Sequence, residues 1–321
     1  MVKKKILITG GSGYLGSRLS FFLSQNGFEI IPLCNSQIPN NKEWVESMYA
    51  ILQGDLRDKT TLNKIELVKP DVIIHLVSLD HHKSGVNIQE TLQINVQTTW
   101  ELLTLSTRLK VEKFIYFSTT QVYGNELDKF VTETTKLSPN NDYALTHMIS
   151  ENIVSFFNRV NAINGITLRL SNSYGEPIFA NEKSWSLVLN DLCKAAFYHK
   201  KIILKSNGKI IKNFIHYSTI NHVVCELLKT KDNLSGIYNL CYSEMISLLD
   251  AAFIIREVYY EMYGVLLDVF INKTEKIEKY EQIINIIGIG FSNNKLTQHI
   301  QFDELPLKYG IKKIFEDLEK K

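Results

Sequence analysis

The chain has 321 residues, of which 45% are hydrophobic, 22% are charged and 11% are aromatic, and its formal net charge is +2. This ordinary globular composition excludes a disordered or fibrous chain, and the small net charge speaks against a general nucleic-acid-binding protein. The length exceeds that of one typical compact core, so we expect two lobes.

The first half of the chain alternates short apolar runs with longer amphipathic stretches. Strands are expected at Lys5–Thr9, Glu29–Leu33, Ala50–Leu52, Val72–Leu76, Lys113–Ser118, Ile166–Leu170 and Ile237–Leu240. Helices are expected at Ser17–Asn26, Leu92–Leu109 and residues 144–161. This order is typical of βαβ units and predicts an α/β fold with a Rossmann-type, doubly wound parallel sheet. We expect residues 1–175 and 212–241 to form this domain, and residues 176–211 and 242–321 to form a smaller mixed α/β substrate lobe.

We expect neither a signal peptide nor a membrane span. The basic N-terminus leads into an apolar run that breaks at Gly10, which is too short for a signal peptide, and no stretch approaches the roughly 18 apolar residues of a spanning helix. The four cysteines are scattered without a metal-binding spacing, at Cys34, Cys193, Cys225 and Cys241. We therefore predict buried, reduced thiols, no metal centre and a cytoplasmic protein.

A glycine-rich turn follows the first expected strand and opens the first expected helix. Gly10 suits a tight turn, Gly13 suits the close approach of a pyrophosphate, and Gly16 suits close helix packing. The start of the helix presents free N–H groups to phosphate charge. The turn therefore predicts a dinucleotide-binding site, which includes Tyr14 and Leu15.

The residues that would choose between NAD and NADP leave the choice open. The second strand is followed by Asn35 and Ser36, with no carboxylate or arginine, and these side chains suit either a ribose hydroxyl or a 2′-phosphate. After the third strand, Asp55 is placed to accept a hydrogen bond from an adenine amino group, or else to cap the next helix. The predicted cofactor is therefore NAD or NADP.

Further motifs follow in order along most of the chain. They are Gly54-Asp55-Leu56, His75-Leu76-Val77-Ser78, Asn95, Ser118-Thr119, Val122-Tyr123-Gly124, Tyr143, Glu151, Asn172, Phe214-Ile215-His216 and Asn294-Lys295-Leu296. In this order and spacing the chain resembles the extended short-chain dehydrogenase/reductases, a family of NAD-dependent nucleotide-sugar epimerases, dehydratases and reductases. The resemblance implies hydride transfer on a nucleotide-diphosphate sugar for surface-polysaccharide synthesis. It also implies a homodimer formed by two long helices, at residues 92–109 and 144–161.

The resemblance also implies roles for single residues. Tyr143 would be the proton donor or acceptor, and Thr119 would hydrogen-bond the reacting oxygen. The cofactor would contact Leu56, Leu76, Val77, Ser78, Asn95, Ser118, Tyr143 and His147. The substrate would contact His81, Thr120, Gln121, Asn172 and Lys212, and this lysine stands where the family has an arginine.

One position departs from the family pattern. The family motif Tyr-x-x-x-Lys reads Tyr143-x-x-x-His147 here, and both positions share one helix face. A histidine can bond the nicotinamide ribose, but it lowers the pKa of the tyrosine only when it is protonated. Because ketone reduction needs a protonated tyrosine and alcohol oxidation needs tyrosinate, the histidine favours reduction of a 4-keto sugar.

Other functions stay open beside this reduction. A nucleotide-sugar 4-epimerase must run both half-reactions, and a catalytically weakened homologue would only bind the cofactor or the nucleotide sugar. A 4,6-dehydratase is disfavoured, because Thr120 and Gln121 stand where that subfamily has an acid and a base, and neither ionises at neutral pH. The loop Asp80-His81-His82-Lys83 is consistent with a sugar or phosphate contact or with a solvated loop, whereas a metal site lacks a third ligand.

Overall fold

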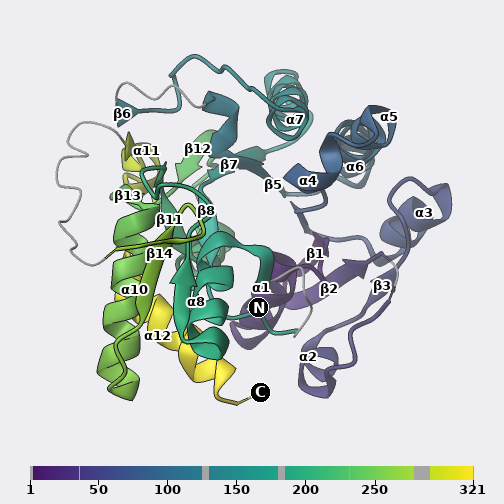
Figure 1. Ribbon diagram of the computed structural model, residues 1–321. Coiled ribbons are helices and arrows are strands. Elements are labelled where there is room, and N and C mark those ends of the chain that lie inside the picture. Colours follow the sequence, from purple (N-terminus) through teal and green to yellow (C-terminus); the bar gives the residue numbers. More distant parts are fainter. Residues whose placement is uncertain are drawn as a thin grey trace.

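A seven-stranded parallel sheet forms the centre of the protein. The structure is a computed structural model that describes residues 3–35, 37–124, 130–179, 185–230, 232–277 and 290–320, apart from the side chains of His81 and His82. The strand order is β12-β7-β5-β4-β1-β2-β3, and every pairing is parallel (Figure 1). The strands are β1 (Lys5–Thr9), β2 (Glu29–Cys34), β3 (Leu52–Gln53), β4 (Val72–His75), β5 (Lys113–Thr119), β7 (Gly165–Leu170) and β12 (Gly236–Leu240). The predicted Rossmann-type fold is confirmed.

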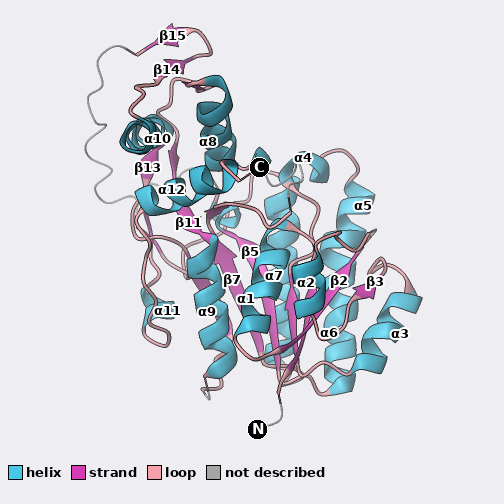
Figure 2. Cartoon of the chain, turned by 90° about the horizontal axis from the view of Figure 1, so that it is seen from below, coloured by secondary structure: helices cyan, strands magenta, loops and turns pink. Residues whose placement is uncertain are grey.

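Helices cover both faces of this sheet, because its central strands are apolar on both sides. On one face lie α1 (Tyr14–Gln25) and α9 (Tyr217–Lys229), whose apolar residues share a core with the strands. On the other face lie α3 (Lys59–Val68), α6 (Thr98–Leu109) and α7 (Asp142–Arg159), which share a second core. Figure 2 shows the strands running among these helices.

Short elements connect these layers. They are α2 (Lys42–Ser47), α4 (His81–Ser84), α5 (Ile88–Leu92), a π-helical turn (Gln93–Gln97), a 3₁₀ turn (Thr120–Tyr123), β6 (Phe130–Val131), β16 (Gly290–Phe291) and α11 (Asn294–Thr297). The predicted helix over Leu92–Leu109 is helical throughout, but a π-helical turn replaces the regular α-helix at Gln93–Gln97. The π-helical turn contains Asn95, whose side chain bonds to groups outside the helix, and hydrophobic periodicity does not reveal such bonds.

A further hydrophobic core lies outside the central sheet. Its helices are α8 (Val188–His199), α10 (Leu248–Tyr263) and α12 (Leu307–Leu318). Its strands are β8 (Asn172–Tyr174), β9 (Lys201–Ile203), β10 (Ile211–Lys212), β11 (Phe214–His216), β13 (Ile246–Ser247), β14 (Asp268–Ile271) and β15 (Glu275–Lys276). We propose this core as the predicted second lobe. Leu296 and Ile300, which the predicted boundaries place there, pack in the α1–α9 core instead. Tyr174 and Phe214, which those boundaries place in the first domain, pack in this second core.

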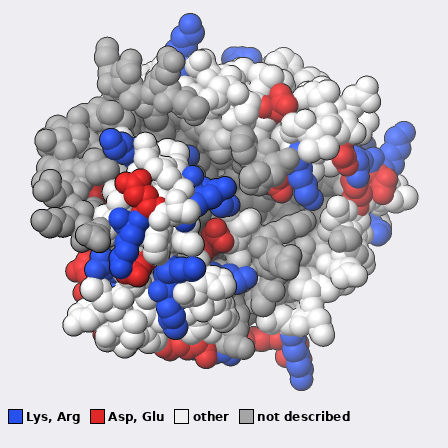
Figure 3. Space-filling view, viewed as in Figure 1, with Lys and Arg blue, Asp and Glu red and all other residues white. Residues whose placement is uncertain are grey.

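The surface carries charges of both signs. On the face shown in Figure 3, several Lys and Arg side chains gather over the second lobe, with acidic side chains among them. Within the described residues, no helix is long and apolar enough to cross a membrane, and no cluster of three or more His, Cys, Asp or Glu could hold a metal ion. All four cysteines are buried and unpaired, as predicted.

One buried ion pair joins the elements that carry the sequence motifs. The Arg169 guanidinium on β7 lies 2.6 Å from the Glu151 carboxylate on α7, and both side chains are 2% exposed. The Ser118 hydroxyl on β5 donates to the same carboxylate. Arg169 also donates to the Tyr123 hydroxyl, which in turn donates to Asn239 on β12. The pair thus ties three neighbouring strands to α7.

Breaking this pair by Glu151→Gln is expected to destabilise the fold by about 3–5 kcal/mol, because Arg169 would remain as a buried and uncompensated charge. Urea denaturation followed by circular dichroism measures the change. As a control, Glu66→Gln removes the partner of Arg108 in an exposed pair and should change the stability by less than about 1 kcal/mol. A loss at Glu151 no larger than that at Glu66 would contradict the bracing role of the buried pair.

Candidate active site

The glycine-rich turn has the tight geometry that the sequence predicts. Gly10 has a φ of +72°, and a Cβ atom at Gly16 would lie 2.1 Å from the carbonyl oxygen of Gly10. Helix α1 begins directly after Gly13, so its first backbone N–H groups lie at the turn. The Tyr14 hydroxyl donates to the Gly175 carbonyl oxygen at 3.0 Å, which links the start of α1 to the end of β8. The turn therefore presents backbone groups, rather than bulky side chains, at the start of α1.

The residues predicted to contact the adenosine half lie at the ends of β2 and β3. Asn35 is exposed directly after β2, and Ser36 lies outside the described residues. Leu56 is buried.

Asp55 is held by a residue that sequence reasoning missed. The Arg57 guanidinium lies 2.6 Å from the Asp55 carboxylate, and a hydrogen bond from Arg57 holds the pKa of Asp55 below its usual value. Helix α3 begins at Lys59 with Asp58 as its N-cap residue, so the alternative that Asp55 caps this helix is wrong. The close spacing of Asp55 and Arg57 was the available sequence signal for the ion pair.

The loop after β4 is braced by Asn95. The Leu79 N–H donates to Asn95 Oδ1 at 2.7 Å, and Asn95 Nδ2 donates to the Thr146 hydroxyl at 3.0 Å. The predicted cofactor segment Leu76–Ser78 is half-buried just before this bond. Asn95 thus joins the loop to α7, and both polar groups of its side chain are engaged within the protein.

Tyr143 lies among the groups predicted for proton transfer. The side chain of Asn141 caps α7, so Tyr143 stands in the first turn of this helix. Burial raises the pKa of Tyr143 to about 12, and the Asp80 carboxylate adds to the rise, whereas hydrogen bonds with Ser78 and Thr119 act against it. The structure therefore brings Thr119, Ser78 and Tyr143 together, and the tyrosine keeps its proton at neutral pH.

His147 stands one helical turn after Tyr143, and the two rings meet edge-on with centroids 4.5 Å apart. The side chain is 3% exposed, and burial lowers its pKa to about 3. Its Nδ1 lies 2.7 Å from the Tyr116 hydroxyl, while its Nε2 is buried without a hydrogen-bond partner among the described residues. The ring is therefore neutral at physiological pH, so it does not supply the charge of the family's lysine.

Ser118 and His81 are two further residues that the sequence predicts as contacts of the cofactor and of the substrate. The Ser118 hydroxyl donates its hydrogen to the Glu151 carboxylate, so this hydrogen is not available to a cofactor. The cofactor contact of Ser118 stays a prediction. His81 begins α4, and its side chain lies outside what the structure describes.

The predicted substrate residues Thr120, Gln121, Asn172 and Lys212 line one cavity of about 560 Å³. Lys209 lines it as well, and sequence reasoning missed this residue although it lies three positions before Lys212. Among the described residues that line the cavity, these two lysines are the only charged ones. The cavity therefore suits an anionic group such as a diphosphate.

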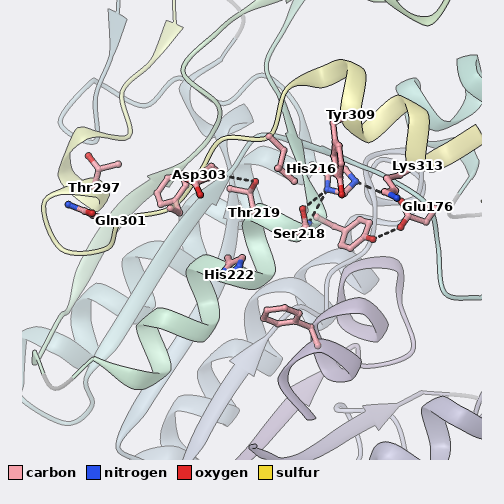
Figure 4. Close-up of a pocket in the computed structure, with 14 residues that line it drawn as sticks. Glu176, His216, Ser218, Thr219, His222, Thr297, Gln301, Asp303, Tyr309 and Lys313 are labelled. Carbon is pink, nitrogen blue, oxygen red and sulfur yellow. Dashed lines mark hydrogen bonds and ion pairs between the residues drawn. The ribbon is translucent and has the colours of Figure 1, made fainter. Parts of the chain in front are cut away.

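A separate cavity of about 1000 Å³ lies beside α9 and α12 and shares no lining residue with the first. In Figure 4, Glu176 and His216 point toward each other, and the Tyr217 hydroxyl donates to the Glu176 carboxylate. Burial raises the pKa of Glu176, but the nearby His216, the charge of Arg18 and the Tyr217 hydroxyl outweigh it and hold this pKa at about 2. Because Arg18 belongs to α1 and Glu176 follows β8, the cluster holds the second lobe against the first.

A comparison with known families defines the class of this protein. The model of the NAD dependent epimerase/dehydratase family matches residues 6–241. The chain therefore belongs to the NAD dependent epimerase/dehydratase family, which confirms the resemblance seen in its motifs.

Relatives with different activities share part of its sequence. The chain is 28% identical over 260 residues to a dTDP-D-glucose 4,6-dehydratase of Bos taurus, covering 78% of this chain and 71% of the relative. It is 25% identical over 271 residues to a UDP-glucose 4-epimerase of Halalkalibacterium halodurans, covering 79% of this chain and 80% of the relative.

Solved structures share its fold. MoeE5 in complex with UDP-glucuronic acid and NAD has a TM-score of 0.79 and 18% identity, covering 99% of this chain and all of the other (100%). The UDP-glucose 4-epimerase of Thermotoga maritima with UDP-glucose has a TM-score of 0.81 and 19% identity, covering 98% of this chain and 99% of the other.

The family is NAD dependent, so the prediction of a nicotinamide dinucleotide cofactor, NAD or NADP, is confirmed. The residues of this chain fit such a group. The close packing of Gly16 on Gly10 leaves backbone N–H groups of α1 available for a pyrophosphate. The buried and unpartnered Nε2 of His147 lacks a bond that a cofactor hydroxyl would supply.

Two buried histidines are expected to make the fold sensitive to mild acid. Burial lowers the pKa of His147 and of His75 to about 3, from an ordinary value of 6.5. Between these values the unfolded state binds more protons than the folded state, so the free energy of unfolding falls as the pH drops. Each histidine contributes about 1.4 kcal/mol per pH unit. Urea denaturation between pH 6 and pH 5 measures this slope before the carboxylates protonate.

The variant His147→Gln should remove about one of these protons and reduce the slope accordingly. The variant His222→Gln, at an exposed histidine on α9, should leave the slope unchanged. A slope that stays the same in His147→Gln would contradict the buried, neutral state of His147.

Proposed function

We propose that the protein reduces the keto group of a nucleotide-activated 4-keto sugar with NADH or NADPH, in the cytoplasm, for the synthesis of surface-polysaccharide sugars. The observation that carries this proposal is a Tyr143 with its pKa raised to about 12 beside a neutral His147. A ketone reduction needs a proton donor at the carbonyl oxygen, and the tyrosine is held in that acid form at neutral pH.

Each residue has a part in this reaction. The reduced nicotinamide, when bound, supplies the hydride for the carbonyl carbon. Tyr143 donates its proton to the carbonyl oxygen, and Thr119 hydrogen-bonds the same oxygen as negative charge develops on it. The N-terminus of α1 would hold the pyrophosphate of the cofactor, and His147 would contact the nicotinamide ribose.

The cavity with Lys209 and Lys212 supports a nucleotide-diphosphate sugar as the substrate. A diphosphate carries negative charge that two lysines and no described carboxylate would meet. Lysine binds a phosphate as a point charge and lacks the bidentate geometry of the family's arginine, so a second lysine compensates in part. Asn172, Thr120 and Gln121 line the same cavity and would contact the diphosphate and the sugar.

Two other reactions of the family are weaker candidates. The relative named UDP-glucose 4-epimerase favours an epimerase, which would need Tyr143 to act as a base as well as an acid. Several relatives are named dTDP-D-glucose 4,6-dehydratase. Dehydration is disfavoured all the same, because Thr120 and Gln121 cannot ionise to serve as acid and base.

We also propose that the protein forms a homodimer through α6 and α7. Trp100 and Phe156 stack on the surface with ring centroids 5.9 Å apart, and they are 46% and 42% exposed. Leu145 and Val160 are exposed at the two ends of α7. Large apolar groups gathered on a surface are typical of an interface between proteins.

The variant His147→Lys tests the direction of the reaction. A lysine would place a positive charge near Tyr143 and lower its pKa, so kcat for alcohol oxidation should rise about 10-fold or more while kcat for ketone reduction changes less than about 3-fold. The KM values would shift in compensation, because the equilibrium constant of the reaction is unchanged. Nicotinamide absorbance measures both directions with a panel of nucleotide-linked 4-keto sugars and the corresponding alcohols.

The matched control is Tyr143→Phe, which should lower both rates about 100-fold or more. Unchanged rates in both directions for His147→Lys would refute the proposed role of the neutral histidine. Epimerisation of UDP-glucose without net consumption of the nicotinamide would select the epimerase. Cofactor binding without turnover of any substrate in the panel would select the weakened homologue.

The variant Phe156→Asp is expected to convert the dimer to a monomer, because it places a charge in the apolar interface. Light scattering after size-exclusion chromatography measures the mass. Tyr260→Asp, at a similarly exposed aromatic residue on α10, should leave the dimer intact. A monomeric wild type, or a dimeric Phe156→Asp, would count against this interface.

A further inference from the structure

The bonds around His147 decide which of its nitrogens carries the proton. Its Nδ1 lies 2.7 Å from the hydroxyl of Tyr116 on β5, and its Nε2 is buried without a partner among the described residues. Tyr116 is 2% exposed, so solvent does not compete for this bond. A neutral histidine has one N–H and one bare nitrogen. Whether Nδ1 carries the hydrogen therefore depends on whether Tyr116 accepts from it or donates to it.

Ser150 on α7 lies close enough to the Tyr116 hydroxyl to lower its pKa, against the larger rise that burial causes. Ser150 gives its one hydroxyl hydrogen to the carbonyl oxygen of Asn95, at 2.7 Å. Ser150 can therefore only accept from Tyr116. Tyr116 can then direct its own hydrogen toward Ser150 and accept from the Nδ1–H of His147, which leaves Nε2 bare.

The opposite arrangement satisfies fewer groups. If Tyr116 donated to Nδ1, the proton of His147 would sit on Nε2, where it has no acceptor among the described residues. A buried N–H without an acceptor is rarer in proteins than an under-used acceptor, so the first arrangement is favoured.

A second chain of bonds ends at the same carbonyl and has its own fixed direction. The Thr99 hydroxyl donates to the Asn95 carbonyl oxygen at 2.9 Å. Thr99 must therefore accept from Nε2 of His75, and Nδ1 of His75 accepts from the Thr9 hydroxyl at 2.7 Å. The same count of donors and acceptors thus assigns opposite tautomers to the two histidines, Nδ1–H in His147 and Nε2–H in His75.

We propose that Tyr116 is a positioning residue that makes the Nε2 of His147 a hydrogen-bond acceptor. A lysine at this position has three donor hydrogens and no acceptor. The histidine therefore reverses the direction of the hydrogen bond that this position offers, besides removing a charge. A hydroxyl group such as a ribose hydroxyl of the cofactor would donate to Nε2. The identity of that hydroxyl rests on the proposed function, whereas the tautomer is a property of the free protein.

Long-range ¹H–¹⁵N correlation spectra of protein labelled with ¹⁵N at histidine distinguish the tautomers. The signals of His147 are assigned by their loss in His147→Gln. We expect the Nδ1–H form in the free protein at pH 7, and the Nε2–H form or a mixture in Tyr116→Phe, which keeps the ring and its packing. Tyr174→Phe removes a hydroxyl buried in the second lobe and should leave the His147 signals unchanged. An Nε2–H form in the wild type, or an unaltered Nδ1–H form in Tyr116→Phe, would overturn the proposal.

The affinity for NADH gives a second readout, measured by fluorescence titration. Tyr116→Phe is expected to raise the Kd for NADH about 3- to 10-fold, because one hydrogen bond to the cofactor is weakened. The same change should have no effect in a His147→Lys background, where the ammonium donates whatever Tyr116 does. Equal losses in both backgrounds would show that Tyr116 acts on the fold alone, and would overturn the proposal. A wild type that binds neither NADH nor NADPH would instead refute the proposed function and leave the spectroscopic result to decide the tautomer.

Discussion

The geometry of the site depends on the buried ion pair between Glu151 and Arg169. A buried charge is tolerated only where its partner stays in place, so this pair resists any slip of α7 along β5 and β7. Ser118, which donates to the same carboxylate, directly precedes Thr119 at the end of β5. The position of Thr119 relative to Tyr143 on α7 is therefore set by electrostatics several residues away from the reacting atoms.

The burial that makes this pairing necessary also sets the protonation states of the site. Removal from water disfavours every charged form, so it raises the pKa of Tyr143 and lowers those of His147 and His75. The result is a site in which Tyr143 keeps its proton and both histidines are neutral. The two lysines of the proposed substrate cavity lie nearer to solvent, where a charge costs little free energy and where a diphosphate would meet it.

Much of the fold and part of the site follow from local patterns in the sequence. Alternating apolar runs predict the βαβ order, and the glycines from Gly10 to Gly16 predict the turn because few other residues fit its backbone. The spacing of Tyr143 and His147 predicts their shared face, since one helical turn separates them. The interruption at Gln93–Gln97 was not predictable, because the side chains that it positions bond to other elements.

The sequence by itself determined the family, the doubly wound sheet, the cofactor turn and the replacement of a lysine by His147, because all of these lie in short segments with characteristic residues. Only the tertiary structure decided what that replacement means. It set His147 against Tyr116, which belongs to a strand 31 positions away in the chain, and it withdrew both from water. Protonation depends on desolvation and on neighbours from distant segments, and neither quantity is a property of a local pattern.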